Sequence, residues 1–274
     1  MPIPDHAIRT ADVDGFRVVY AHQEEFDNLR REIFGDRAYR FDWRGAAPRI
    51  LDCGAHIGLS VLYFKRRWPR AQITAFEPSP DTFALLERNV GSNGLADVEL
   101  VNAAITASGD ATSFYVPRDP LFWHWGDAAT RAPWYDPEYY REITVRAVRL
   151  SAYLAGPVDF LKLDIEGLET AVLREADAAG RLAMIRRAVI EYHGSTKTPE
   201  NSLPWLRDVL ARRGFATAVR QGGRLTAEAD LSRTGAWTAL VHADRSRARL
   251  WWGFRREIAG RAAQKARRVA ELNR

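Results

Sequence analysis

The feature that most constrains this fold is a buried strand that breaks at a glycine and continues as a helix. It spans Ile50 to Ser60, which read ILDCGAHIGLS, and residues 76–79 follow as Phe-Glu-Pro-Ser. The second piece is typical of the next parallel strand, and it ends in the carboxylate of Glu77. In an α/β sheet, a glycine turn after one strand and an acid at the end of its neighbour hold a nucleoside. We therefore expect a nucleoside-bearing cofactor; the alternative is an ordinary strand–turn–helix with acids placed by chance.

The glycine spacing indicates which nucleoside cofactor this turn accepts. Dinucleotide sites need Gly-x-Gly-x-x-Gly, because pyrophosphate lies against bare backbone at a helix N-terminus. Here Gly54 and Gly58 are present, but His56 occupies the place of the middle glycine. Its side chain obstructs a pyrophosphate, whereas S-adenosylmethionine carries no phosphate. We expect Asp52 to serve the ammonium or a water network of the methionine end, and Glu77 to accept both ribose hydroxyls.

Alternating strand and helix signals continue along the chain. Strands fit 49–54, 71–77, 97–102, 111–116, 142–148, 158–165 and 185–192, and helices fit 58–67 and 81–91. A last pair of strands, 215–221 and 236–242, is split by Gln221-Gly222-Gly223 and is expected to be antiparallel. This alternation favours a doubly wound α/β fold, in which helices cover both faces of a mostly parallel sheet. Residues 1–45 precede it as a lead-in, with a strand over 16–20 and a helical pattern after it.

Four motifs in order give the chain a family resemblance. They are Asp52-Cys53-Gly54-Ala55-His56-Ile57-Gly58, Phe76-Glu77-Pro78-Ser79, Asn102-Ala103-Ala104-Ile105 and Lys162-Leu163-Asp164-Ile165-Glu166-Gly167. The stretch from about Tyr39 to Gly194 resembles the FkbM family of S-adenosylmethionine-dependent methyltransferases. The resemblance implies a class I, Rossmann-like methyltransferase fold with a seven-stranded sheet, and methylation of hydroxyl oxygens on secondary metabolites and sugars. One position departs from it, because the family usually has Asn where this chain has His56.

The turn and the resemblance together define an expected cofactor site. Asn102 and Ala103 follow the third strand and resemble the family's adenine-side positions. The alternative for Asn102 is a turn-forming role. The cofactor-binding residues that we expect are Asp52, Gly54, Ala55, His56, Gly58, Glu77, Asn102 and Ala103.

Ionisable residues gather at the ends of two later strands. Period-two alternation places Lys162, Asp164 and Glu166 on one side of a strand, and it pairs Glu191 with His193 on another. Charged residues inside apolar strands are costly unless paired, so an internal contact or a function is expected. An alcohol acceptor needs a base, and His193 is the first choice because an unperturbed histidine is partly neutral at pH 7. Asp164 is second, with Glu191 or Glu166 orienting the imidazole or holding the acceptor hydroxyl.

Two other roles stay open for these residues. Asp164 and Glu166 can organise the cofactor pocket and its loop without taking part in catalysis. Together with Glu191 and His193 they can also collect a divalent cation, which would acidify the acceptor hydroxyl. Their spacing matches no strict metal motif, so a metal is not favoured.

An aromatic segment interrupts the strand and helix rhythm at residues 117–142. Seven of its 26 positions are aromatic, and four prolines discourage regular structure there. We expect a lid that forms the acceptor pocket, and the alternative is a capping subdomain that only covers core. The substrate-binding residues that we expect are Trp123, His124, Trp125, Trp134 and Tyr135. In the alternative, His124 is simply part of the packing.

The positive charge of the chain lies at its C-terminal end. Residues 245–274 hold ten arginines and lysines against two glutamates, while the remainder holds 30 basic and 33 acidic residues. A nucleic-acid enzyme more often spreads positive charge around its cleft. The tail predicts a basic amphipathic helix with Trp251, Trp252, Phe254 and Ile258 on or near one face. Such a helix can lie on an anionic membrane surface or join two copies of the chain; the alternative is a solvated or folded-back helix.

Composition sets the expected domain organisation and location. The 274 residues, 46% of them hydrophobic, fit one methyltransferase domain over 46–244, with the lead-in over 1–45 and the tail over 245–274. Cys53 is the only cysteine, so no internal disulfide is possible and a reducing cytoplasm fits. No apolar run reaches spanning length, and the N-terminus lacks the layout of a secretion signal. We therefore expect a cytoplasmic protein, with the tail as a candidate for peripheral membrane contact.

The leading hypothesis is an S-adenosylmethionine-dependent O-methyltransferase that acts on a hydroxyl of a small molecule, such as a secondary metabolite, sugar or glycan. Three alternatives stay open. A nicotinamide-dependent oxidoreductase would have to do without the middle glycine of the turn. A nucleic-acid methyltransferase would need the tail for its affinity. A non-catalytic cofactor-binding module would keep its biological activity when Asp164 or His193 is replaced by alanine.

Overall fold

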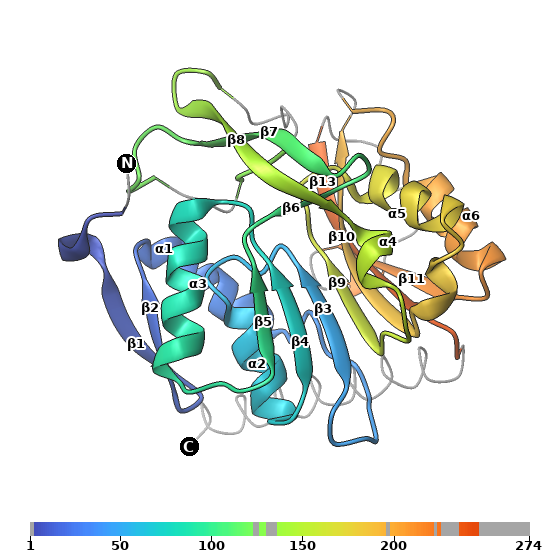
Figure 1. The fold of residues 1–274 in the computed structure, drawn as a ribbon, viewed down its shortest axis with the longest axis horizontal. Helices are drawn as coiled ribbons and strands as arrows, with labels where there is room; N and C mark the ends of the chain where they lie inside the picture. The colour runs from blue at the N-terminus through green and yellow to red at the C-terminus, as the bar shows by residue number, and fades with distance from the viewer. Residues whose placement is uncertain are drawn as a thin grey trace, which may run out of the picture.

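A mostly parallel sheet runs through the middle of the molecule (Figure 1). This computed structural model describes residues 3–122, 126–129, 136–195, 198–221, 224–225 and 236–246. The strand order is β12-β11-β13-β10-β9-β3-β4-β5. The strands are β3 (Arg49–Cys53), β4 (Gln72–Phe76), β5 (Val98–Val101), β9 (Phe160–Leu163), β10 (Arg187–Ser195), β11 (Ala216–Gln221), β12 (Arg224–Leu225) and β13 (Ala236–Asp244).

The direction of the strands confirms the predicted fold class. Within β10-β9-β3-β4-β5, each strand pairs in parallel with its neighbour. β13 is antiparallel to both β10 and β11, which is the closing pair that the sequence predicted. Apart from the two-residue β12, the sheet is therefore the mostly parallel, seven-stranded sheet of a class I methyltransferase fold.

Helices cover both faces of this sheet. They are η1 (Asp5–Ala7), α1 (Gln23–Arg30), η2 (Arg31–Gly35), α2 (Leu59–Arg67), α3 (Pro80–Ser92), α4 (Leu150–Tyr153), α5 (Glu169–Ala178), η3 (Leu182–Met184) and α6 (Leu203–Arg212). Two neighbouring residues of β3 show the arrangement: Ile50 packs into an apolar core with α2 and α3, and Leu51 packs into another with α5 and α6. Because a strand buried on both faces has to be apolar on both, the sequence around Ile50 lacks polar alternation.

The lead-in forms a hairpin and a helix beside the central sheet. Its strands are β1 (Arg9–Val13) and β2 (Phe16–Tyr20), which pair antiparallel. Asn89 of α3 connects β2 to the glycine turn. Its Oδ1 atom accepts a hydrogen bond from Val19 N at 2.7 Å, and its Nδ2 atom donates to Val19 O at 3.0 Å and to Ile57 O at 2.8 Å. The lead-in therefore helps to hold the turn that follows β3.

A separate three-stranded sheet lies over the carboxyl ends of the central strands (Figure 1). It consists of β6 (Ala104–Thr106), β7 (Asp110–Pro117) and β8 (Tyr140–Arg149), in the order β6-β8-β7. The strands predicted over 111–116 and 142–148 are thus present as β7 and β8, but outside the central sheet. Together they form an antiparallel pair, and the lid segment is the connection between them. The lid therefore starts and ends above the edge where ligands of parallel sheets bind.

Several predictions fall outside the described residues. They concern the five acceptor residues Trp123, His124, Trp125, Trp134 and Tyr135, the Gly222-Gly223 turn and tail residues 247–274. In the ranges that the structure does describe, no helix combines the length and the apolar character needed to cross a bilayer.

Candidate active site

The glycine turn after β3 is held by the end of β4. Gly54 N and Ala55 N both donate to Phe76 O, at 3.0 and 2.8 Å. The backbone has positive φ at Gly54, His56 and Gly58, at 81°, 52° and 90°. A Cβ atom on Gly54 would lie 1.9 Å from the carbonyl oxygen of Asp164, so only glycine fits there. The turn therefore packs bare backbone directly against the residue that follows β9.

Glu77 organises the same turn from the end of β4. Its carboxylate accepts from His56 N and from Ser79 N, both at 2.9 Å. Burial raises the pKa of Glu77 to about 7, although the neighbouring His56 and these hydrogen bonds lower it. Each carboxylate oxygen keeps a lone pair after accepting one backbone N–H, so both can still accept a hydroxyl. Asn102 supports the strand end by donating to Glu77 O at 2.8 Å and to Pro78 O at 3.2 Å.

A pocket opens where the turn, the end of β4 and the end of β9 meet. Six residues predicted from the sequence line it: Gly54, His56, Glu77, Ala103, Asp164 and Glu166. We call this the cofactor pocket. Asp127 and Ala129 of the lid line it as well, together with Phe114 of β7. Ala55, Gly58, Asn102 and Asp52 are not among its lining residues, and their expected contacts with the cofactor stay predictions.

Asp52 differs most from its expected role. It is fully buried, accepts a hydrogen bond from Ser60 Oγ at 2.6 Å and lies 3.6 Å from the ammonium of Lys162. Burial raises the pKa of Asp52, and Lys162 and Ser60 work against that increase. Its carboxylate thus faces a lysine inside the protein, where we had expected the methionine end of a cofactor.

Lys162 is the buried cation of the site. Its Nζ atom lies 3.1 Å from Asp164 Oδ2 and donates to Gly54 O at 2.5 Å. Burial alone would lower the pKa of Lys162, but Asp164 and Asp52 outweigh it and raise the pKa above its ordinary value. The ammonium therefore connects three parts of the site: the end of β3, the glycine turn and the end of β9. A lysine in the middle of an apolar strand was the sequence signal that such a pairing exists.

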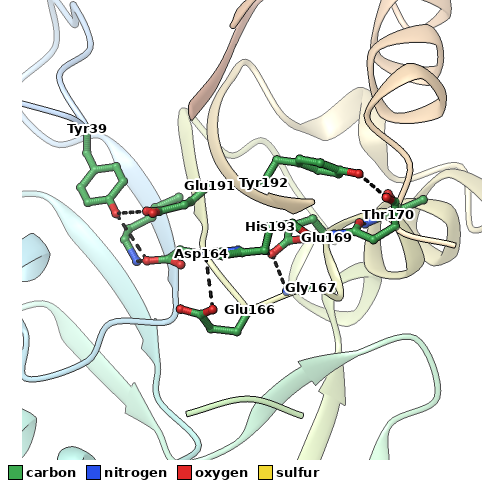
Figure 2. A network of polar contacts seen from close by, with 11 residues as sticks. Tyr39, Asp164, Glu166, Gly167, Glu169, Thr170, Glu191, Tyr192 and His193 are labelled. Carbon is green, nitrogen blue, oxygen red and sulfur yellow. Dashed lines mark hydrogen bonds and ion pairs between the residues drawn. The ribbon is translucent and has the colours of Figure 1, made fainter. Parts of the chain in front are cut away.

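His193 lies between two glutamates (Figure 2). Its Nδ1 atom is 2.9 Å from Glu169 Oε1, and its Nε2 atom is 3.3 Å from Glu166 Oε2. Glu169 is fully buried and also accepts from Asn201 Nδ2 at 2.7 Å. Burial alone would lower the pKa of His193, but Glu166 and Glu169 raise it well above the ordinary value. Glu169, which we had not singled out from the sequence, therefore orients the imidazole.

Three acids of the site have raised pKa values. Burial raises the pKa of Glu166 to about 8, with Asp164 adding to the effect and His193 opposing it. Burial, Asp164 and Glu32 raise the pKa of Glu191. Burial and Asp164 likewise raise the pKa of Glu32. Buried carboxyl groups that lie close together hold protons near neutral pH, because two neighbouring negative charges repel each other. Such a group of carboxyls can exchange protons at neutral pH.

Tyr39 joins the two strand ends. Its hydroxyl lies 3.4 Å from Asp164 Oδ2 and 3.3 Å from Glu191 Oε2 (Figure 2). Asp164, Glu191 and His193 each offer one ligand atom, and these three atoms lie within 4.8 Å of one another. They are three of the four residues that the sequence indicated could collect a divalent cation. A positive charge is already present beside them, because the Lys162 ammonium touches Asp164.

Comparison with known proteins decides the class of this site. The family model described as methyltransferase FkbM domain matches residues 52–217, which include the turn, the cofactor pocket and the carboxylate–imidazole cluster formed by Asp164, Glu166, Glu191 and His193. The chain belongs to the FkbM methyltransferase family. It is an S-adenosylmethionine-dependent methyltransferase, and this removes the nicotinamide-dependent oxidoreductase as an alternative.

Curated relatives of this FkbM methyltransferase are distant but cover most of it. Methyltransferase sdnD of Sordaria araneosa is 29% identical over 220 residues, which are 68% of this chain and 81% of that protein. The 31-O-demethyl-FK506 methyltransferase FkbM of Streptomyces tacrolimicus is 29% identical over 235 residues, or 76% and 88%. Among solved structures, M. jannaschii TYW2 in complex with AdoMet covers 86% of this chain and 85% of its own at 13% identity, with a TM-score of 0.45.

The residues of this FkbM methyltransferase fit its cofactor in two respects. Gly54 lines the pocket without a side chain, and the Glu77 carboxylate lines it with a lone pair left on each oxygen after its two backbone hydrogen bonds. His56 stands where the family usually has asparagine, and only its ring distinguishes it, because an asparagine would offer the same backbone N–H. Its backbone N–H donates a hydrogen bond to Glu77 Oε2. Its ring Nε2 atom lies 3.3 Å from Glu25 Oε1 of α1. The imidazole is thereby turned toward the lead-in.

Proposed function

We propose that this methyltransferase transfers the methyl group to a hydroxyl oxygen of a small molecule. The observation that carries the proposal is the convergence of Asp164, Glu191 and His193 within 4.8 Å, beside the pocket that Asp164 also lines. An alcohol needs a base when it acts as a nucleophile, and such a cluster can take up its proton. The printed name of one relative, a 31-O-demethyl-FK506 methyltransferase, assigns an oxygen acceptor to that relative and supports the same reaction here.

Residues of the cofactor pocket have distinct parts in this proposal. Glu77 binds the two ribose hydroxyls, Gly54 offers backbone to the methionine end, and Ala103 lies on the adenine side. When bound, the cofactor supplies an electrophilic methyl group on a sulfonium. Asp127 and Ala129 close the pocket from the lid, so they exclude water from the donor. Alignment of the acceptor oxygen with this methyl group supplies most of the acceleration.

The acceptor proton goes to the carboxylate–imidazole cluster. His193 is the first candidate base and Asp164 is the second. Glu166 and Glu169 raise the pKa of His193, and burial raises the pKa of Glu166 to about 8, so the imidazole and Glu166 titrate as a pair. His193 acts as the base in the state in which its ring is neutral, and the neighbouring glutamates then stabilise the proton that it takes up. Glu169 positions the ring and does not touch the acceptor.

The test is a methyl-transfer assay with two pools of acceptors, one of small hydroxylated molecules and one of RNA and DNA. Purified protein and methyl-labelled S-adenosylmethionine are incubated with each pool, and S-adenosylhomocysteine and label are followed. We expect label on a hydroxyl oxygen of a small molecule, and its loss in the His193→Ala variant. Label found only in nucleic acid would overturn the proposal. Cofactor binding without any turnover would favour a non-catalytic module.

A further inference from the structure

Helix α1 of the lead-in carries a buried acid next to the glycine turn. Glu25 is only 6% exposed, and its Oε1 atom lies 3.3 Å from Nε2 of His56. A carboxylate is costly to bury unless it has partners, and His56 is one of them. The family model begins at residue 52, so α1 and Glu25 lie outside the part of the chain that it matches.

His56 has a backbone conformation that residues with a side chain seldom adopt. Its φ is 52°, in the left-handed region. A Cβ atom makes this region unfavourable, and a residue stays there only where its surroundings hold it. The backbone N–H of His56 donates to Glu77 Oε2 at 2.9 Å. Because the peptide plane that carries this N–H turns with φ, whatever holds His56 in place also holds its hydrogen bond to Glu77.

The lead-in contacts the turn at two successive residues. Asn89 joins Ile57 to Val19 of β2, since its Nδ2 atom donates to both carbonyl oxygens. Glu25 contacts the ring of His56, one residue earlier. A small cavity between α1 and the turn is lined by Glu25, His56 and Ile57. The cavity leaves the imidazole room to turn, so its position depends on polar contacts rather than on close packing.

The same end of α1 reaches the lid. His22 directly precedes the helix, and its Nε2 atom contacts the carbonyl oxygen of Leu121. Burial raises the pKa of Tyr140 at the start of β8, and the charge of Glu25 is among those that add to the effect. Helix α1 therefore lies against both the glycine turn and the lid, which line the cofactor pocket from different sides.

We propose that Glu25 is a positioning residue for the cofactor. It holds the ring of His56 and thereby keeps the His56 N–H directed at Glu77. The turn is then already formed when the cofactor arrives, so binding does not have to order it. Glu25 acts only through His56, because it does not itself line the cofactor pocket. The proposal goes beyond the proposed function, since it concerns the methyl donor and holds for any acceptor.

The role of Glu25 depends on the residue at position 56. An asparagine there adopts the left-handed conformation more readily than other residues with a side chain. Its side chain is also shorter than that of histidine, so it ends farther from Glu25. The dependence of cofactor binding on Glu25 should therefore disappear in a His56→Asn background.

The experiment uses the full chain and measures S-adenosylhomocysteine affinity by calorimetry. Glu25→Leu removes the polar contact with His56, and Glu24→Leu makes the same change at the exposed neighbouring position of α1. Glu25→Leu is also made in the His56→Asn background, which completes a double-mutant cycle. Glu25→Gln keeps the volume of the side chain and one acceptor oxygen. The midpoint of urea unfolding without cofactor shows for each variant that the protein is folded.

We expect Glu25→Leu to raise the dissociation constant of S-adenosylhomocysteine about fivefold or more. Glu24→Leu should stay within about twofold of wild type. In the His56→Asn background, adding Glu25→Leu should change the affinity by less than about twofold. Glu25→Gln should lose less affinity than Glu25→Leu, because its amide oxygen can still accept from the His56 ring.

Three results would overturn the proposal. Wild-type affinity in folded Glu25→Leu would show that the contact has no effect on the cofactor. The same loss from Glu25→Leu in both backgrounds would show that Glu25 supports the fold generally and not through His56. A larger loss in Glu25→Gln than in Glu25→Leu would show that contact with His56 Nε2 is not the cause. Each of these results would leave the proposed hydroxyl acceptor untouched, because none depends on methyl transfer.

Discussion

The ammonium of Lys162 lies 3.1 Å from Asp164 Oδ2, and both residues belong to the same strand end. The lysine side chain is 3% exposed and the aspartate 22%, so the pair joins the protein interior to the cofactor pocket. Asp52 lies behind the lysine at 3.6 Å and has no exposed surface. One cation thus balances a buried carboxylate on one side and a partly exposed carboxylate that lines the cofactor pocket on the other.

Replacing Lys162 by methionine should destabilise the fold strongly. The change leaves Asp52 as a buried charge without its cation, and breaking a buried ion pair costs about 3–5 kcal/mol. Chemical denaturation measures the loss in the free energy of unfolding. The control is the double variant Lys162→Met with Asp52→Asn, which removes the orphaned charge and should regain part of the stability. If the double variant is no more stable than the single one, Asp52 does not depend on Lys162.

The stability of the protein without cofactor should fall as pH rises from about 4.5 to about 8, and Glu166 should cause part of the fall. Its pKa is 4.5 when unfolded and about 8 when folded, so the folded state binds its proton more tightly. That contribution is complete below pH 4.5 and is lost as pH rises through 8, with a slope of at most about 1.4 kcal/mol per pH unit.

Glu166→Gln, which cannot titrate, should flatten this slope in urea titrations at several pH values. Glu87→Gln, at an exposed position of α3, is the surface control. An unchanged slope in Glu166→Gln would show that Glu166 releases its proton at a pH near that of the unfolded chain.

His193→Ala should reduce turnover much more than cofactor affinity. The imidazole touches Glu166 and Glu169 and does not line the cofactor pocket. Loss of a general base lowers kcat by about 10²- to 10⁴-fold. Steady-state rates and S-adenosylhomocysteine affinity are measured together, with His6→Ala, an exposed histidine of η1, as the control. A normal rate at saturating acceptor would exclude His193 and leave Asp164 as the base.

Glu77→Ala should weaken cofactor binding before it affects the rate at saturation. Hydrogen bonds to a charged group contribute about 1.5–3 kcal/mol each, so loss of the ribose contacts should raise the dissociation constant about tenfold or more. Calorimetry with S-adenosylhomocysteine measures it. Glu99→Ala, an exposed position of the neighbouring strand β5, is the comparison. Wild-type affinity in Glu77→Ala would refute the ribose role.

The sequence could predict that the glycine turn and Glu77 lie together because the parts are short and local. A strand, a glycine turn and the next strand end are consecutive in the chain, so their meeting at one pocket follows from spacing, while their contact with the cofactor stays a prediction. Partners distant in sequence could not be assigned in this way. Tyr39 is 125 residues from Asp164, and Asn201 is 32 residues from Glu169. Only the folded chain shows that they touch.

Two other differences have physical reasons. Periodicity identifies a strand but not its partner, so β7 and β8 were expected in the central sheet and form a sheet of their own. The role of Asp52 depends on where Lys162 points, because a carboxylate at a strand end can face either the ligand or the interior. Because the Lys162 ammonium is buried, it needs carboxylates beside it, and Asp52 faces it from the interior at 3.6 Å.

Methyl transfer should survive removal of divalent cations. Asp164, Glu191 and His193 are close enough to share an ion, yet the Lys162 ammonium already supplies positive charge at Asp164, and Glu166 and Glu169 face the two ring nitrogens of His193. A cation would have to displace one of these contacts. Initial rates before and after dialysis against EDTA should therefore agree within about twofold. If EDTA abolishes the activity, Mg²⁺ restores it and Asp164→Asn abolishes that rescue without unfolding the protein, the cluster is a metal site and the cation, not the imidazole, acidifies the acceptor hydroxyl.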